Sequence, residues 1–181
     1  MHNKGQKRND ILTKVLLKGK EVALRGGFLK IGNLAPDFAL VAKDLENKTL
    51  ESFKGKKKVI ATVPSIDTGV CAAETRELNL LALEFPSVLF LIVSKDLPFA
   101  FDRFCKQGNL HNIITLSDIR SQSNFAKDYG VGIVSGPLDG LLARSIIFLD
   151  EFDKVLHSEL SLEITSMPNF DNLRTSLQNA R

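Results

Sequence analysis

Apolar residues occur along the chain in short continuous runs, which are separated by longer stretches of mixed polarity. Residues 59–63 and 88–93 are two such runs, as expected of central strands that are covered on both faces of a sheet. Residues 72–84, between these runs, predict a helix. The same pattern predicts further helices at residues 98–106 and 123–129 and a strand at residues 112–116. Strands that alternate with helices indicate an α/β domain.

Two pairs of apolar segments with polar turns between them predict β-hairpins in the two outer parts of the chain. The first hairpin covers residues 14–25, and the second joins residues 141–149 to residues 155–160. The final helix follows Pro168 and has an apolar face formed by Phe170, Leu173 and Leu177. This order of elements predicts a thioredoxin-like α/β fold, in which a mixed central β-sheet is flanked by helices and preceded by an N-terminal β-hairpin extension.

The chain has 181 residues, of which 44% are hydrophobic, so it can form one domain with a sizeable core; we expect this domain to span residues 14–181. The net charge is +3, but residues 1–20 carry six basic residues against one acidic residue. The rest of the chain therefore has a small negative net charge. We expect a disordered basic tail at residues 1–13 and no nucleic-acid-binding surface on the domain.

Composition also indicates the cellular compartment in which the protein is expected. No apolar run approaches the ~18 residues of a membrane span, and the charged N-terminus is not followed by the continuous apolar region of a secretory signal. Two cysteines are too few for a secreted fold that is held together by disulfides. We therefore expect a cytoplasmic protein without a membrane partner, whose two thiols serve redox chemistry rather than structure.

The segment PSIDTGVC, residues 64–71, joins a predicted strand to a predicted helix. Thr68 is a plausible N-cap, whose hydroxyl would accept a hydrogen bond from an amide of the first turn. Cys71 would then be the third helical residue, where unpaired amides and the helix dipole favour the reactive thiolate. Cys71 is therefore a candidate nucleophile; the alternative is that it is a small buried apolar residue, as many single cysteines are.

Several motifs together resemble the thiol peroxidases, an atypical two-cysteine branch of the peroxiredoxins. The segment that ends at Cys71 resembles the peroxidatic segment of this family, and DLPFA followed by RFC, residues 96–105, resembles its resolving segment. Shorter matches cover residues 35–38, 129–131, 136–138, 140–141, 143–144, 163–165 and 168–169. The resemblance extends over about residues 14–180.

The resemblance assigns roles around a reacting peroxide. Cys71 would be the peroxidatic residue, which attacks the O–O bond and becomes a sulfenic acid. Because negative charge spreads over sulfur and both oxygens in the transition state, hydrogen-bond donors aimed at that region would lower the barrier. The proposed donors are the amides of Gly69, Val70 and Cys71, the Thr68 hydroxyl and the Arg144 guanidinium. Pro64, which has no N–H, would shield the sulfur from water.

Each of the supporting residues also has a purely structural interpretation. Thr68 could simply cap the helix, and Pro64 could simply end the preceding strand. Arg144, expected within a neighbouring strand, could be half-buried in a salt bridge. Cys105 could be a packed residue beside Phe101 in its own helix.

The resemblance further implies that Cys105 is the resolving residue and forms an intramolecular Cys71–Cys105 disulfide. A disulfide needs Cα atoms within about 7 Å, which two residues packed on separate helices seldom satisfy. We therefore expect one or both segments to unwind during turnover. By resemblance, thioredoxin would reduce the disulfide, the substrates would be hydrogen peroxide and organic hydroperoxides, and the protein would be a homodimer.

Other kinds of redox protein are less consistent with the sequence. The position of the second cysteine in a thioredoxin-type CxxC motif is taken by Glu74. The three histidines, at positions 2, 111 and 157, have no metal-ligand spacing with either cysteine, and Gly130-x-Gly132 lacks the rest of a dinucleotide motif, so we expect no metal or other cofactor. A non-enzymatic redox sensor that uses the same disulfide remains the alternative. It would consume one equivalent of peroxide, whereas an enzyme turns over repeatedly.

Overall fold

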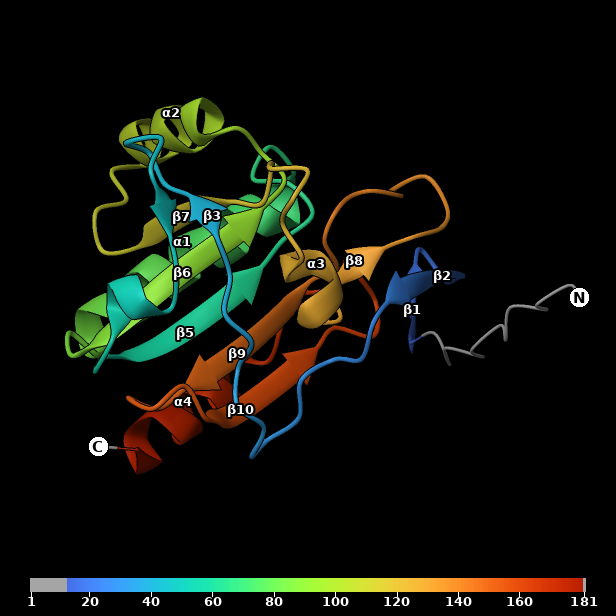
Figure 1. Cartoon of the computed structure of the whole chain (residues 1–181). Helices are drawn as coiled ribbons and strands as arrows, with labels where there is room; N and C mark the ends of the chain where they lie inside the picture. Colours follow the sequence, from blue (N-terminus) through green and yellow to red (C-terminus); the bar gives the residue numbers. More distant parts are fainter. Residues whose placement is uncertain (1–12, 181) are drawn as a thin grey trace, which may run out of the picture.

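The computed structural model describes residues 13–180, which form two β-sheets with helices around them (Figure 1). The basic tail expected at residues 1–13 lies outside the described residues except for Thr13. The large sheet has seven strands in the order β10-β9-β5-β6-β7-β3-β4. Its strands are β3 (Leu40–Val41), β4 (Asn47–Lys48), β5 (Lys57–Thr62), β6 (Val88–Ser94), β7 (Ile114–Ser117), β9 (Ser145–Leu149) and β10 (Val155–Leu160).

The large sheet is mixed, as its sequence predicts. β5 pairs parallel with β6, and β6 pairs parallel with β7, whereas β9 and β10 continue the sheet in antiparallel pairing. Side chains alternate between two buried layers along β5: Val59 and Ala61 pack in one, and Ile60 in the other. Burial on both faces explains why the central strands are continuous apolar runs.

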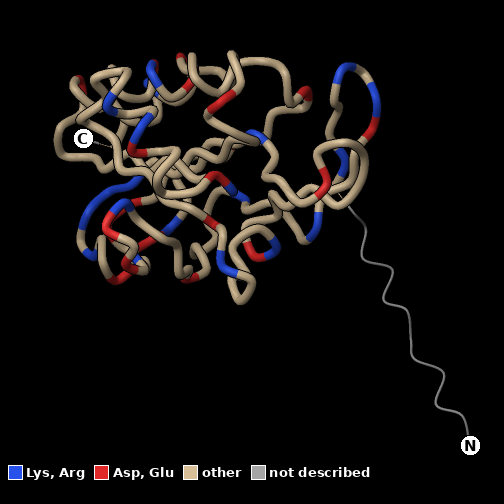
Figure 2. The backbone as a smooth tube through the Cα atoms, turned by 90° about the horizontal axis from the view of Figure 1, so that it is seen from above, with Lys and Arg blue, Asp and Glu red and all other residues tan. Residues whose placement is uncertain are grey.

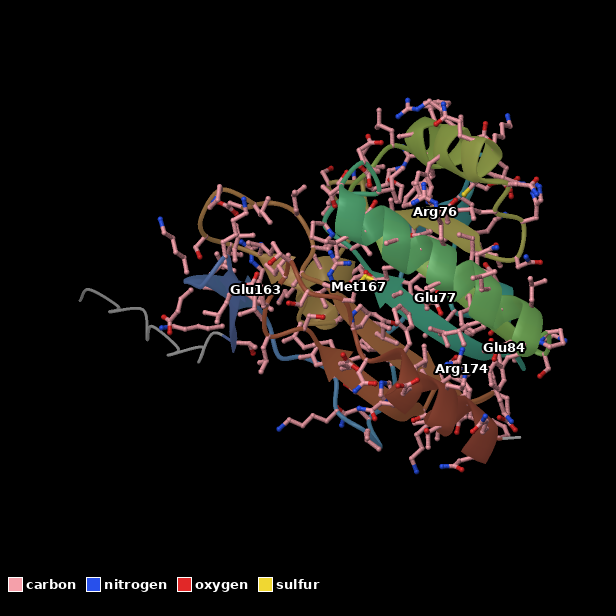
Figure 3. All side chains as sticks on the ribbon, turned by 180° about the vertical axis from the view of Figure 1, so that it is seen from behind. Arg76, Glu77, Glu84, Glu163, Met167 and Arg174 are labelled. Carbon is pink, nitrogen blue, oxygen red and sulfur yellow. The ribbon has the colours of Figure 1, made fainter. Side chains whose placement is uncertain are left out.

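Helices α1 (Gly69–Glu84) and α4 (Phe170–Asn179) pack in the layer that contains Val59 and Ala61. α1 contributes Leu78 and Leu81, and α4 contributes Leu173 and Leu177. Figure 3 shows α1 and α4 side by side, with Glu84 of α1 facing Arg174 of α4; the two are paired at 3.1 Å. α2 (Pro98–Gly108) lies beside β7 in Figure 1. A short 3-10 helix, η1 (Glu51–Phe53), and α3 (Phe125–Asp128) belong to the opposite layer.

The N-terminal hairpin forms a separate small sheet. β1 (Thr13–Leu17) pairs with β2 (Lys20–Arg25), and β2 pairs with the short strand β8 (Gly132–Ile133). Both residues of the turn between β1 and β2, Lys18 and Gly19, have positive φ angles of 50° and 77°, as in a two-residue hairpin turn of type I′. The hairpin therefore forms as predicted, and it covers an apolar cluster of its own.

The thioredoxin-like α/β prediction is confirmed, with several boundaries moved. The strand expected at residues 141–149 begins only at Ser145, because residues 141 and 143 form backbone hydrogen bonds with residues 133 and 131. The helix expected at residues 123–129 is reduced to α3. Basic and acidic residues are interspersed along the chain (Figure 2). Between residues 13 and 180, no helix has both the length and the apolarity to span a membrane.

Candidate active site

The candidate nucleophile lies where the sequence predicts it, in the first turn of α1. Thr68 is the N-cap, with extended backbone angles, so Cys71 is the third helical residue. Its side chain is only 1% exposed. The amides of the first helical turn have no carbonyl partners within the helix, and they surround this position with partial positive charge.

The prediction that the Thr68 hydroxyl accepts a capping hydrogen bond is wrong. Its side chain accepts no hydrogen bond from the first turn. Instead, its hydroxyl donates to the Ser65 carbonyl at 3.2 Å. Short hydroxyl side chains readily bond to nearby backbone groups, and the carbonyl three residues earlier competes successfully for this one. Thr68 is exposed, so its hydroxyl lies at the outer side of the helix start.

Arg144 is the charged group that contacts the thiol. Its Nη2 lies 3.2 Å from Cys71 Sγ, and its Nε donates to the Ile164 carbonyl at 2.9 Å. Its Nη1 is paired with the Glu74 carboxylate. The residue is 1% exposed, and it directly precedes β9 rather than lying within a strand. Three contacts thus fix the plane of the guanidinium, with one edge on the sulfur.

Glu74 lies one helical turn after Cys71 and is fully buried. Burial raises the pKa of its carboxyl group from 4.5 to about 7, although the neighbouring Arg144 favours the charged form. Its second oxygen, Oε1, has no hydrogen-bond partner among the described residues. The site therefore contains a buried acid that can change its protonation state near neutral pH.

Asp96 fastens the segment that leads into α1. Its carboxylate accepts hydrogen bonds from the Ser65 hydroxyl at 2.8 Å, the Ile66 amide at 2.9 Å and the Ser94 hydroxyl at 2.7 Å. Ser94 ends β6, and Asp96 lies two residues before α2. One carboxylate thus joins the approach to Cys71 to the end of a central strand and to the start of the helix that carries Cys105.

The other predicted residues of this segment have different environments. Pro64 is buried two residues after β5, Gly69 is exposed and Val70 is half-buried. Pro64 therefore lies on the inner side of the loop, whereas Gly69 is on the side open to solvent. Gly69 has no neighbouring atom within 4 Å of an added Cβ, so there is open space beside the first residue of α1.

Cys105 lies in α2 in a separate environment, and both cysteines are free. It is half-buried and lines a cavity of about 560 Å³, together with Lys43 of the β3–β4 segment and Asp102. Burial and the nearby Asp102 charge raise the pKa of its thiol, and Lys43 opposes this shift. The two sulfur atoms therefore lie in different surroundings.

Among the predicted residues, the structure brings Cys71 and Arg144 into direct contact and leaves Cys105 in a separate cavity. Sequence reasoning missed the roles of Glu74 and Asp96 in this site. Glu74 has a usable signal, because it lies three residues after Cys71 and hence on the same side of a helix. Asp96 has no such signal beyond its motif, since its partners in the segment before α1, Ser65 and Ile66, are 31 and 30 residues away.

Comparisons with known proteins agree with this geometry. The sequence model of the Redoxin family matches residues 30–177. The chain is 44% identical over 161 residues to a thiol peroxidase of Leptospira interrogans, covering 88% of this chain and 94% of that relative. It is 46% identical over 160 residues to a thiol peroxidase of Staphylococcus haemolyticus, with the same coverage.

Solved structures show the same fold. A peroxiredoxin-like protein from Aquifex aeolicus superimposes with a TM-score of 0.87 at 39% identity, covering 94% of this chain and 99% of that chain. A thiol peroxidase from Chromobacterium violaceum superimposes with a TM-score of 0.85 at 28% identity, covering 92% and 95%. The chain therefore belongs to the Redoxin family and, within it, to the thiol peroxidases, which are oxidoreductases of the peroxiredoxin type.

Proposed function

We propose that Cys71 is the peroxidatic residue of this thiol peroxidase and that Cys105 resolves its oxidised form through an intramolecular disulfide. The observation that carries the first part is the contact of 3.2 Å between Arg144 Nη2 and Cys71 Sγ. A buried guanidinium beside a thiol at a helix start stabilises negative charge on sulfur. The same group can stabilise the charge that develops on a peroxide in the transition state.

In the first step, the Cys71 thiolate attacks one peroxide oxygen in line with the O–O bond. The S–O bond forms as the O–O bond breaks, so sulfur is oxidised and the peroxide is reduced. The leaving oxygen departs as hydroxide or alkoxide and takes up a proton to become water or an alcohol. The products are a sulfenic acid on Cys71 and the reduced substrate.

The surrounding residues divide the work of this step. Arg144 supplies a fixed positive charge, and the amides at the start of α1, including those of Gly69 and Val70, supply dipoles aimed at the same region. Pro64 keeps water from the inner side of the sulfur. The exposed hydroxyl of Thr68 would leave the Ser65 carbonyl and turn toward a bound peroxide.

In the second step, the Cys105 sulfur attacks the Cys71 sulfenic acid. An S–S bond forms, the S–OH bond breaks, and the oxygen leaves as water after protonation. Because Cys71 is buried and Cys105 lines a separate cavity, the start of α1, the Cys105 segment or both must unwind first. This movement would break two contacts between α2 and the region of α1. One is the exposed ion pair between Asp67 and Arg103 at 3.6 Å. The other is the stacking of Arg76 over the Phe104 ring at 5.6 Å.

The proposal also covers the partners of the reaction. Hydrogen peroxide and organic hydroperoxides are the substrates, and thioredoxin returns the disulfide to two thiols as its own dithiol is oxidised. This cycle suits the cytoplasm, where thiols are kept reduced. We further propose that the protein works as a homodimer, as the family resemblance implies.

Peroxide consumption coupled to thioredoxin tests the proposal. The wild-type protein should consume many equivalents of peroxide, Cys71→Ser should consume none, and Cys105→Ser should form the sulfenic acid without recycling through the disulfide. Intact-protein mass spectrometry should detect one added oxygen on Cys105→Ser and a loss of two hydrogens on the wild-type protein. Full activity of Cys71→Ser would overturn the assignment, and consumption of only one equivalent by the wild-type protein would indicate a sensor instead.

A further inference from the structure

We propose that Glu163 is a positioning residue for the peroxide step, because it joins the turn of the N-terminal hairpin to the backbone carbonyl that orients Arg144. The inference rests on the proposed function of Arg144 at Cys71. It gives the hairpin, which precedes the residues matched by the Redoxin family model, a part in the active site.

The Ile164 carbonyl is the contact that fixes the inner end of the Arg144 guanidinium. Nη1 and Nη2 contact two residues of α1, Glu74 and Cys71, whereas Nε donates to Ile164 at 2.9 Å. A guanidinium that is held at both ends keeps its plane, and its distance from the sulfur is then set by the positions of α1 and the Ile164 carbonyl. Displacement of the Ile164 carbonyl would therefore change the aim of Nη2 at Cys71.

Ile164 lies in a segment without helix or strand, so its own element does not fix its carbonyl. Two hydrogen bonds to the hairpin do so: the Leu16 amide donates to the Leu162 carbonyl at 2.7 Å, and the Ile164 amide donates to the Leu16 carbonyl at 2.8 Å. The Ile164 side chain is buried in the apolar cluster beneath the hairpin, with Val15 and Val22. The segment therefore takes its position from β1.

Glu163 fastens this junction at the tip of the hairpin. Its Oε1 accepts from the Lys18 amide at 3.0 Å and from the Thr165 amide and hydroxyl at 3.0 and 2.7 Å, and its Oε2 accepts from the Gly19 amide at 3.0 Å. Successive amides of a tight turn form a cradle for an anion. The bonds from Gly19, Thr165 and Lys18 hold the pKa of Glu163 down at about 2.

Figure 3 shows Glu163 where the chain passes beside the hairpin. Glu163 and Thr165, the two residues on either side of Ile164, are bonded to each other, and Glu163 is also bonded to Lys18 and Gly19 of the hairpin. Loss of the carboxylate would release the hairpin tip and the residue after Ile164 together. The guanidinium would remain buried, but the carbonyl that orients it would be less well fixed.

The test is the rate constant for oxidation of Cys71 by hydrogen peroxide, measured in a single turnover on pre-reduced protein. Glu163→Ala should slow this step roughly tenfold, since small misplacements in an active site cost about that much or more. Glu163→Gln should recover most of the rate, because an amide oxygen can replace Oε1 and only the Gly19 bond is lost. Glu21→Ala is the matched control: it breaks the exposed pair with Lys14 on the same hairpin and should leave the rate unchanged.

A double-mutant cycle with Arg144 separates positioning from a general loss of stability. In a background of Arg144→Met with Glu74→Gln, the further change Glu163→Ala should slow oxidation less than twofold. A wild-type rate for Glu163→Ala, or the same tenfold loss in both backgrounds, would overturn the inference. If Glu163→Ala does not fold, Glu163→Asp, whose shorter side chain cannot reach both the hairpin amides and Thr165, decides by the same comparison of the two backgrounds. A wild-type rate in the background variant itself would instead refute the proposed role of Arg144.

Discussion

Replacement of Arg144 by methionine is the perturbation with the clearest expected result. The substitution keeps a long side chain in a buried position but removes the donor that lies 3.2 Å from Cys71 Sγ. Removal of one donor that stabilises charge in a transition state typically costs about 10²–10³ in rate, or about 2.7–4 kcal/mol. Oxidation of Cys71 by peroxide should therefore slow by roughly this factor.

The same substitution alone also destabilises the fold, which must be separated from the effect on the rate. Glu74 is fully buried, and breaking a buried ion pair on one side costs about 3–5 kcal/mol. Because Arg144 favours the charged form of Glu74, its removal raises the pKa of this carboxyl further. The stability of Arg144→Met should therefore fall more steeply than that of the wild-type protein as pH rises toward 8.

The double variant Arg144→Met with Glu74→Gln resolves the ambiguity, because neither buried side chain then carries a charge. Its free energy of unfolding, measured by urea denaturation, should exceed that of Arg144→Met alone at pH 8. Its rate of Cys71 oxidation, measured by stopped flow on the reduced protein, should remain about 10²–10³ below wild type. A folded double variant that oxidises within threefold of the wild-type rate would refute the catalytic role of Arg144.

Three further predictions use other residues of the site. Folding raises the pKa of Glu74 from 4.5 to about 7, so protonation of its carboxyl group stabilises the native state at low pH. Between pH 4.5 and 7, the free energy of unfolding of the wild-type protein, measured by urea denaturation, should therefore fall by up to about 3 kcal/mol relative to that of Glu74→Gln. Asp102 raises the pKa of Cys105, so Asp102→Asn should speed disulfide formation at pH 7 in quenched-flow mass spectrometry. Asp102 is also paired with Lys106 at 2.6 Å, and Lys106→Gln, which breaks this ion pair but keeps the Asp102 charge, should not speed it. Asp96→Asn should loosen the segment before α1 and, under excess peroxide, change the ratio of sulfinic acid to disulfide by more than twofold; an unchanged ratio would contradict this role.

The local part of the site could be predicted from the sequence. A cap residue followed by a cysteine three positions later is a pattern of adjacent residues, and the structure places Cys71 as the third residue of α1. The direction of the Thr68 hydroxyl could not be predicted in this way. It can donate to the Ser65 carbonyl or accept from an amide of the first helical turn, and these backbone groups compete for it. The outcome depends on the turn at Ser65, which is itself held by Asp96.

The supports of the site could not be predicted, because they join residues that are far apart in the sequence. Glu74 and Arg144 are 70 residues apart, and Lys18 and Glu163 are 145 residues apart. Periodicity assigns each residue to an element and a face, but it contains no information on which loop approaches which strand end. The N-terminal hairpin was therefore predicted as an element, while its contact with the segment beside Arg144 was not.

Arg144 illustrates why a residue identified by a motif can still be placed in the wrong element. The apolar run at residues 141–149 predicts one strand, but its first part bonds to residues 131–133, beside the small sheet, and its second part forms β9 of the large sheet. Arg144 lies between the two parts. The buried Thr62 hydroxyl contacts the residues on either side, donating to the Ala143 carbonyl at 2.6 Å and lying 2.7 Å from the Ser145 hydroxyl. A strand residue would have to point to one face of the sheet, whereas a residue at this junction can direct its guanidinium across the strand end toward α1. The position of the charge beside Cys71 therefore depends on both sheets.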